Sequence, residues 1–270
     1  MLRKISLSII VLYSLCITPF QAYAAEGNQQ QTSSSVKVPN STLNISKENT
    51  YPNATQDMPY LQPSELAKEL LDTSNVKIEN PDLIRMLNES TISKSVLGLG
   101  SRATIFLGHW PLNYESTETT TNWEYQRINA NLFDNRAGKM PYQIRYKQEE
   151  QRQIKGGLTA RVPNVEHVKQ MMLLKAMSKT NLPLAFTTVI GAGTKKDQVY
   201  NVPPKKVGYL YGYAPAVNEK GKVTYGEVYL VLKGTKRMII VKNVTSQGIG
   251  AWIPVQDYVS FGFAVYDHHR

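Results

Sequence analysis

One run in the second half of the chain limits the fold most strongly, because it predicts two antiparallel strands joined by a tight turn. Residues Lys222 to Lys233 are rich in Val, Tyr and Leu, and Gly234-Thr235 separates them from a second such run, Lys236 to Thr245. Glycine at the first of two loop positions suits a type II′ turn, whose twist matches that of the flanking strands. A hairpin of this kind predicts antiparallel pairing.

Two other segments alternate in the way expected of strands with one buried face. Tyr142, Ile144 and Tyr146 alternate with polar residues, among them Arg145 and Lys147 on the wet face. Near the C-terminus, four apolar side chains occupy every second position: Val259, Phe261, Phe263 and Val265. These patterns add strands to the predicted antiparallel sheet.

Three segments have the signals of helices. Ser64 precedes an acidic and apolar run, Glu65 to Leu71, and is the kind of residue that caps a helix N-terminus. Asn80-Pro81 introduces the second helix, which extends to Leu87, and Pro in the first turn is favourable there. The clearest helix runs from Val165 to Lys179, with an apolar stripe through Val168, Met172 and Ala176. The predicted fold is α+β, a predominantly antiparallel sheet with about three helices packed on it.

The N-terminus predicts an export signal. Residues 1–24 consist of a short cationic start, an apolar run and an Ala-x-Ala ending, which are the parts of a cleavable signal peptide. The apolar run is too short for a typical membrane anchor, although retention as an anchor is the alternative. Residues 25–58 are rich in Asn, Gln, Ser and Thr, which predicts a flexible polar leader. Residues 59–270 then form a single domain, and the protein is expected outside the cytoplasmic membrane or in the cell wall.

Composition narrows the chemistry. Cys16 is the chain's one cysteine, and it lies in the signal, so the exported form is expected to contain no disulfide, thiolate nucleophile or thiolate metal site. The net charge of +10 favours anionic partners. Because an exported protein does not meet nucleic acid as a usual target, the expected partners are anionic cell-wall polymers, anionic lipid head groups or another protein.

Four runs carry a resemblance to a known family: Trp110–Glu115, Asn122–Tyr125, Gly191–Lys196 and Gly248–Pro254. In these runs the chain resembles the YfkD-like family of exported proteins from Bacillus-type bacteria. The resemblance extends over nearly the whole predicted domain. It implies export and a Gram-positive envelope, and it implies no particular activity.

Two glycine-rich motifs do not predict phosphate binding. Gly98 to Ala103 matches the G-x-G-x-x-A spacing of dinucleotide sites, but a strand pattern follows where such a site needs a helix. Gly191 to Lys196 lacks the spacing of a phosphate loop and is interpreted as a loop after the strand Phe186 to Ile190. No cofactor is expected.

No catalytic or metal site is predicted. His109 ends a predicted strand, and its use as a base would require an orienting acid; the nearest in sequence are Glu115, Glu118 and Glu124. His167 lies in the first turn of the third helix, and the pair at the C-terminus belongs to a chain end. A glycosidase needs only two suitably spaced carboxylates, so a cell-wall hydrolase using Glu115 and Glu124 is kept as the alternative function.

Two features are candidate binding sites. Tyr209, Tyr211 and Tyr213 alternate along a strand and therefore share one sheet face. If a helix covers that face, the rings are core with hydroxyls at the rim, which is the favoured interpretation; if it is open, the rings can stack on sugar or peptide. The other feature is a set of basic pairs in predicted loops: Lys195-Lys196, Lys205-Lys206 and Lys236-Arg237.

If the fold gathers these pairs, they form a surface that attracts polyanions, and the alternative is scattered solvated charge. The leading functional hypothesis is an envelope-associated binding module, probed through salt dependence because exposed charges are screened. It is expected to be non-enzymatic.

Overall fold

Strands dominate the part of the chain that can be described. The computed structural model describes three stretches: residues 36–54, 62–90 and 102–269. In chain order their elements are β1 (Thr42–Asn44), α1 (Glu65–Leu71), α2 (Pro81–Glu89), β2 (Arg102–Asp134), β3 (Tyr142–Lys147), β4 (Arg152–Lys155), β5 (Gly157–Leu158), α3 (Val165–Thr180), β6 (Thr187–Ile190), β7 (Lys195–Val202), β8 (Val207–Lys233), β9 (Lys236–Pro254) and β10 (Tyr258–Tyr266). The predicted signal peptide, residues 1–24, and the glycines of the first glycine-rich motif lie outside the described residues.

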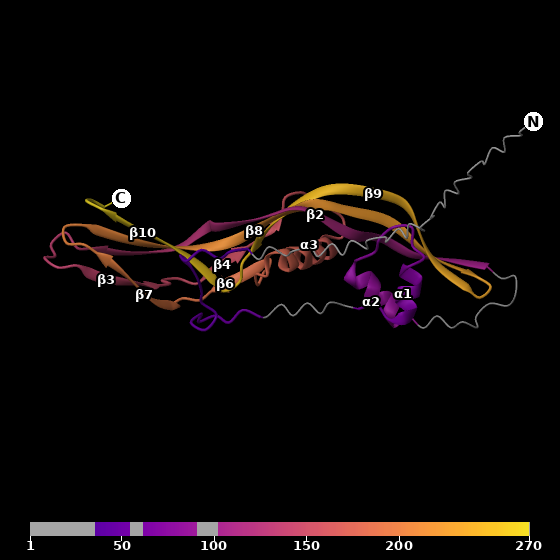
Figure 1. Cartoon of the computed structure of the whole chain (residues 1–270), viewed down its shortest axis with the longest axis horizontal. Coiled ribbons are helices and arrows are strands. Elements are labelled where there is room, and N and C mark those ends of the chain that lie inside the picture. Colours follow the sequence, from indigo (N-terminus) through magenta and orange to yellow (C-terminus); the bar gives the residue numbers. More distant parts are fainter. Residues whose placement is uncertain (1–35, 55–61, 91–101, 270) are drawn as a thin grey trace, which may run out of the picture. The chain divides into compact units, whose positions relative to one another are not determined.

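The largest sheet is organised by β8. β2 runs antiparallel to β8 along its whole length, while β10 pairs with the first part of β8 and β9 with the remainder (Figure 1). β1 extends the sheet beyond β10, and β5 extends it beyond β9. β3 pairs with β7 and β4 with β6 in two small sheets. Every named pair is antiparallel, so this part of the predicted fold is confirmed for the described residues.

The pairing of β2 with β8 is unusually long for a globular protein. β8 has 27 residues and β2 has 33, whereas strands usually have about 5 or 6 residues. β2 contains Pro111, which is tolerated because β2 pairs only with β8 within this sheet and so lies at its edge. Five register shifts interrupt the β2–β8 pairing, and such bulges let a long ribbon twist and bend.

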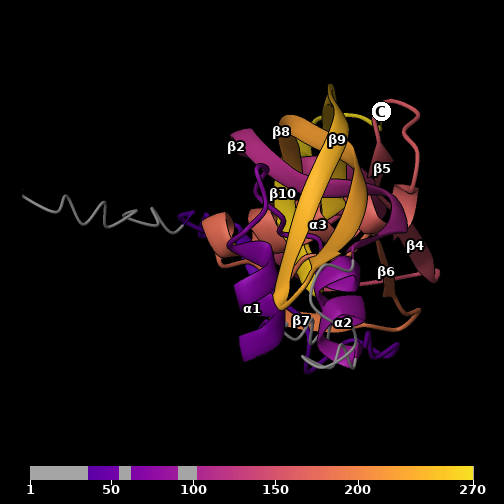
Figure 2. The same ribbon diagram turned by 90° about the vertical axis from the view of Figure 1, so that its right-hand side faces the viewer.

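The three predicted helices are confirmed. Ser64 accepts a hydrogen bond from the amide of Ala67 at the start of α1, and Asn80 caps α2 through the amides of Asp82 and Leu83. α3 begins at Val165 as predicted and packs against β2 and β8 (Figure 2). With three helices among the described residues and far more strand than helix, this part of the chain is mainly β.

Apolar side chains form three buried clusters in the described structure. One lies between α3 and the middle of β8 and includes Val217 and Val223. A second lies where β3, β7 and β10 meet the first part of β8 and includes Leu210. The third lies beneath α1 and α2, against the last part of β8, and includes Val228 and Leu230. A single ribbon of two strands therefore contributes to three separate cores.

Part of the predicted leader is packed on the domain. β1 pairs with β10, and Ile45 next to it is fully buried. The side-chain amides of Asn49 and Asn53 each donate to the carbonyl of Val189 and to Oδ1 of Asp257, at 2.8–2.9 Å. Residues 42–54 are therefore packed on the domain and differ from a flexible leader. Their Asn side chains form hydrogen bonds to buried backbone groups, an interaction that does not depend on burying an apolar core.

Candidate binding face

Four tyrosines lie together on one face of the sheet. Tyr209, Tyr211 and Tyr213 of β8 point the same way, with ring centroids 5.8 Å apart for the first pair and 6.3 Å for the second. Tyr266 of β10 meets the ring of Tyr209 edge-on at 5.7 Å. We call these four residues the tyrosine row. All four are half-buried, so part of each ring is accessible to a ligand.

The row is exposed because the residues between its members form the core. Leu210 and Ala214 are buried in the second cluster, and alternation along a strand sends their tyrosine neighbours to the opposite face. Gly212 is required at its position, since a Cβ there would lie 2.7 Å from the ring of the buried Tyr146. The favoured expectation, that a helix covers the tyrosines, does not hold: α3 packs on β8 elsewhere, where residues 217–225 contribute to the first cluster.

The surroundings of the row leave room for a ligand. Small residues stand beside the rings, with Ala130 of β2 and Gly262 of β10 both opposite Tyr211. An open hollow of about 820 Å³ is lined by Tyr209, Tyr211 and residues of β2 and of the β3–β4 region. The guanidinium of Arg127 lies 5.6 Å from the ring centre of Tyr211, a cation–π contact. The hollow therefore combines aromatic surface with two arginines, Arg127 and Arg152, and two glutamates, Glu149 and Glu150.

One phenol of the row has an altered acidity. Burial, with smaller effects of neighbouring phenols, raises the pKa of Tyr211 above its ordinary value. Its hydroxyl therefore remains protonated at neutral pH and can donate a hydrogen bond to a ligand.

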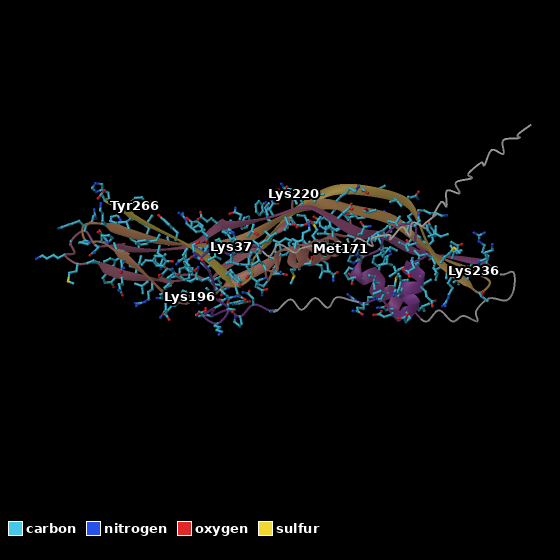
Figure 3. The ribbon with its side chains drawn as sticks, in the orientation of Figure 1. Lys37, Met171, Lys196, Lys220, Lys236 and Tyr266 are labelled. Carbon is cyan, nitrogen blue, oxygen red and sulfur yellow. The ribbon has the colours of Figure 1, made fainter. Side chains whose placement is uncertain are left out.

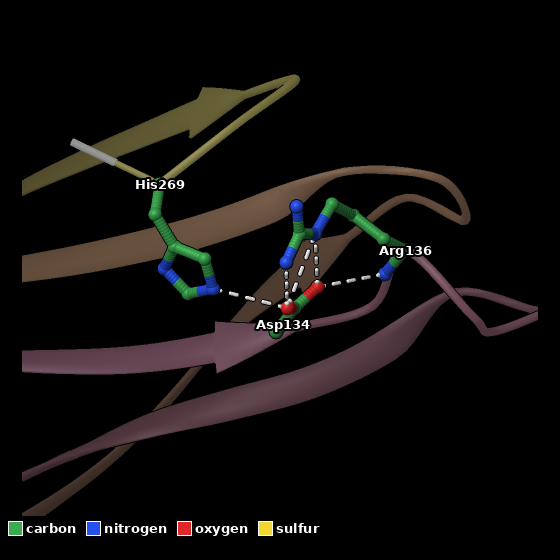
Figure 4. Close-up of polar contacts among 3 residues, drawn as sticks. All are labelled: Asp134, Arg136 and His269. Atoms are coloured by element: carbon green, nitrogen blue, oxygen red, sulfur yellow. Dashed lines mark hydrogen bonds and ion pairs between the residues drawn. The ribbon is translucent and has the colours of Figure 1, made fainter.

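An ion-pair cluster lies at the end of β2, close to the tyrosine row. Tyr209 pairs with Leu132, two residues before the end of that strand. Asp134 accepts hydrogen bonds from Nε and Nη2 of Arg136, at 2.9 and 2.7 Å, and contacts Nε2 of His269 at 3.0 Å (Figure 4). The hydrogen bonds from Arg136 hold the pKa of the Asp134 carboxyl well below its usual range. Asp134 is consequently an anchoring anion and not a proton donor at neutral pH.

Comparison with known proteins identifies the family. The family model described as YfkD-like protein matches residues 39–270. The chain belongs to the YfkD-like family. Over 227 residues it is 73% identical to "Uncharacterized protein YfkD" of Bacillus subtilis (strain 168). The aligned residues cover 84% of this chain and 86% of that protein. No solved structure matches the chain. The resemblance inferred from four short runs is thus confirmed.

The basic pairs of this YfkD-like chain do not form one surface. Lys206 lies just before the first residue of β8, whereas Lys236 pairs with Lys233, the last residue of β8. The length of β8 therefore separates these two basic pairs. In Figure 3, the labels Lys196 and Lys236 mark two of the three pairs. Lys196 forms an ion pair with Glu48 at 2.7 Å, and Lys206 forms one with Asp267. Two of the three expected loop positions need correction, because Lys195 and Lys196 begin β7 and Lys236 and Arg237 begin β9. Lys205 and Lys206 lie in the loop between β7 and β8, as expected.

The two glutamates named for a hydrolase do not meet. Glu115 and Glu124 are both exposed on β2, nine positions apart along one strand. At about 3.3 Å per residue this separates them by roughly 30 Å. Paired glycosidase carboxylates lie within about 10 Å of each other. This pair cannot perform that chemistry.

Two histidines of the YfkD-like chain, His109 and His167, contact aromatic rings. His109 lies within β2 and not at a strand end; it stacks on Tyr225 at 5.8 Å, opposite Glu227, an acid distant in sequence. His167 stacks on Trp110 at 5.4 Å, and its Nε2 lies 3.3 Å from Asp82. Within the described stretches no three His, Cys, Asp or Glu side chains are grouped closely enough to hold a metal ion.

One buried acid was not found from sequence. Glu219 of β8 is fully buried under α3, where it accepts hydrogen bonds from Tyr114 at 3.0 Å and from Thr119 at 2.6 Å. Burial and the neighbouring Glu219 raise the pKa of Tyr114 far above its ordinary value, which keeps its hydroxyl a donor. Glu219 does not line the hollow beside the tyrosine row. We interpret it as part of a structural network.

Two members of the binding face also escaped the sequence analysis. Arg127 lies in a polar part of β2 where no strand was predicted. Tyr266 directly follows the residues expected on one face of the last strand, so alternation alone places it on the other face, with the tyrosines of β8.

No helix in the described stretches is long and apolar enough to cross a bilayer.

Proposed function

We propose that this YfkD-like protein is exported to the Gram-positive envelope and binds glycan strands of the cell wall through the tyrosine row. The observation that carries the proposal is the row itself, four half-buried rings on an open sheet face beside a hollow of about 820 Å³. The N-terminal sequence supports export, because residues 1–24 have the three parts of a signal peptide.

An extended polymer fits the row better than a compact ligand does. Successive tyrosines repeat every second residue along β8, so a chain of linked rings meets one phenol after another. The apolar faces of sugar rings pack on aromatic rings, and phenol hydroxyls at the rim bond sugar hydroxyls. Arg127 adds a cation for the negative charges of a wall glycan.

Binding without catalysis is the function that this face supports. Its nearest carboxylates are already in ion pairs or hydrogen bonds: Glu150 with Arg152 at 2.9 Å, Glu149 with Asn131 at 3.1 Å, and Asp134 with Arg136. The hydrogen bonds from Arg136 hold Asp134 as an anion, whereas a general acid must carry a proton at neutral pH.

Co-sedimentation of residues 25–270 with isolated Gram-positive cell walls tests the proposal, with walls prepared both with and without teichoic acids and across a salt series. We expect binding to persist when teichoic acids are removed and to weaken only in part with salt, since stacking on tyrosine is not screened. Tyr211→Ala is expected to weaken binding about tenfold or more, by analogy with about 1–3 kcal/mol per stacked ring in other polymer-binding sites.

Tyr229→Ala is the matched control. Tyr229 is also a half-buried tyrosine of β8 but lies outside the row, against Phe106 at 5.1 Å. It is expected to bind walls like the unaltered protein. Binding that disappears with the teichoic acids would overturn the glycan proposal and assign the ligand to an anionic polymer held by the lysines. Equal losses in both tyrosine variants would also contradict it.

A further inference from the structure

A second hollow, remote from the tyrosine row, lies among the three helices. It measures about 540 Å³ and is lined by the end of α1, the segment between α1 and α2, the start of α2, and α3. Leu71, Ile78, Ile84 and Leu174 supply apolar walls. This volume falls within the range of small-molecule sites, which are mostly apolar with a few polar groups that fix orientation.

The α3 side of the hollow is partly apolar and partly polar. Val168, Met172 and Ala176 follow one stripe into the core against the sheet. A second set, Met171, Leu174, Lys175 and Ser178, follows the i, i+3, i+4, i+7 spacing of another face and lines the hollow (Met171 is labelled in Figure 3). Met171 also belongs to the first core cluster, whereas Leu174 is half-buried and lies outside it.

The opposite wall is held in place by backbone and cap contacts. The amides of Glu79 and Asn80 both donate to the carbonyl of Leu112 in β2, at 2.7 and 3.0 Å. The side-chain amide of Asn80 donates to the carbonyl of Pro111 at 2.7 Å. The segment between α1 and α2 therefore follows β2, and the hollow is preformed.

Charge is concentrated at one side of this apolar space. Glu79 forms ion pairs with Lys77 at 2.6 Å and with Lys175 at 3.2 Å. Burial acts to raise the pKa of Glu79, but the hydrogen bond from Lys77 and the charge of Lys175 together hold it below its usual value. The ionised lining, two lysines and one glutamate, thus carries a formal charge of +1.

We propose that this hollow binds a fatty acid, with the carboxylate beside Lys175 and Lys77 and the hydrocarbon chain against Leu71, Ile78, Ile84 and Leu174. Charge complementarity selects the head group, because one carboxylate balances the positive lining. The apolar walls select the hydrocarbon chain, since burying methylene groups away from water is favourable. The site is independent of the tyrosine row, because the two hollows share no lining residue.

The test is a fluorescence titration of residues 25–270 with a conjugated polyene fatty acid, followed by displacement with oleate and with oleyl alcohol. We expect saturable binding of the probe and displacement by oleate at concentrations at least about tenfold below those needed for the alcohol, which lacks the charge. Lys175→Gln is expected to weaken oleate about tenfold and to leave the alcohol unchanged, because it removes a charge-assisted hydrogen bond of about 1.5–3 kcal/mol.

Two further variants make the result decisive. Lys179→Gln is the matched control: it lies one turn beyond Lys175 on α3, bonds the hydroxyl of Ser116 and does not line the hollow, so oleate binding should be unchanged. Leu174→Trp fills the hollow from a half-buried position and should abolish probe binding with an unchanged urea midpoint.

Several results would overturn the inference. These are no saturable probe binding, equal affinity for oleate and oleyl alcohol, or probe binding that persists in Leu174→Trp. Wall sedimentation of Leu174→Trp, expected to match the unaltered protein, separates this inference from the proposed glycan function.

Discussion

Two stretches of the same strand, β8, have opposite environments. Residues 217–225 lie beneath α3 and bury Val217, Glu219 and Val223. Residues 209–213 present the tyrosines outward and bury only the small or apolar residues between them. In residues 209–213 the even-numbered residues face the core, whereas in residues 217–225 the odd-numbered ones do. A register shift between β2 and β8 lies between the two stretches, opposite Ala214 and Ala216, where the regular alternation is interrupted.

The comparison shows that aromatic residues at alternating positions do not by themselves indicate a core. Under α3, Tyr114 and Tyr225 are almost fully buried and each hydroxyl bonds a protein acceptor, Glu219 and the carbonyl of Pro163 respectively. In the open stretch the rings contact one another and Arg127. The covered stretch should therefore control stability, and the open stretch should control binding.

The largest expected effect is that of Tyr114→Ala. It removes a buried ring and the hydrogen bond from Tyr114 to the carboxylate of Glu219, which keeps the bond from Thr119. A loss of about 3–5 kcal/mol in the free energy of unfolding is therefore expected. Tyr211→Ala in the open stretch should cost about 1 kcal/mol or less. Urea denaturation of both variants measures the contrast, and similar losses would remove it.

A glycine pair gives a smaller contrast. A Cβ at Gly221 would lie 2.2 Å from the carbonyl oxygen of Glu115 and 2.6 Å from the Tyr114 hydroxyl, whereas one at Gly262 would meet Tyr213 at an ordinary 3.4 Å. Gly221→Ala is expected to lower the unfolding free energy by about 1–3 kcal/mol through overpacking. Gly262→Ala should be nearly neutral. The same urea experiment checks both, and a neutral Gly221→Ala would contradict the close packing of Tyr114.

The smallest expected effect concerns alkaline pH. Burial raises the pKa of Tyr225 to about 12, above the value of about 10 for an unfolded tyrosine. The unfolded chain therefore loses this proton first, so the stability contribution of Tyr225 is complete below about pH 10 and is lost as the pH rises to about 12. In Tyr225→Phe the fall in unfolding free energy over that range should be shallower, and urea midpoints measured at several alkaline pH values test it. Identical pH profiles would contradict the assignment.

The elements of the fold were predictable where local chemistry determines them. Ser64 and Asn80 cap their helices as expected, and Gly234, with φ +57°, forms the turn between β8 and β9. The length of β2 was not predictable, because its many Thr, Asn and Glu side chains give no alternating apolar pattern. β2 is a strand because it pairs with β8, and some of the paired residues are more than a hundred positions apart in the sequence. Local propensity carries no information about so distant a partner.

The candidate site was predictable only in part. Alternation placed Tyr209, Tyr211 and Tyr213 on one face, but whether α3 covers that face depends on where the helix docks. The basic pairs were recognisable as charge, yet their separation depends on the length of β8. Glu219 gave no signal, since it stands in a run of polar residues, Asn218 to Lys220, that resembles a loop.

The pairing of β1 with β10 has a kinetic consequence. This contact joins the two ends of the described chain, and the nearby bond from Asn49 to Asp257 links residues 208 positions apart. Contacts so distant in sequence slow folding, because the loop must close before they are gained. The sheet therefore cannot gain its β1 edge until the last strand of the chain is in place. Docking of residues 42–54 should accordingly be one of the late steps of folding, after the β8–β9 hairpin has formed.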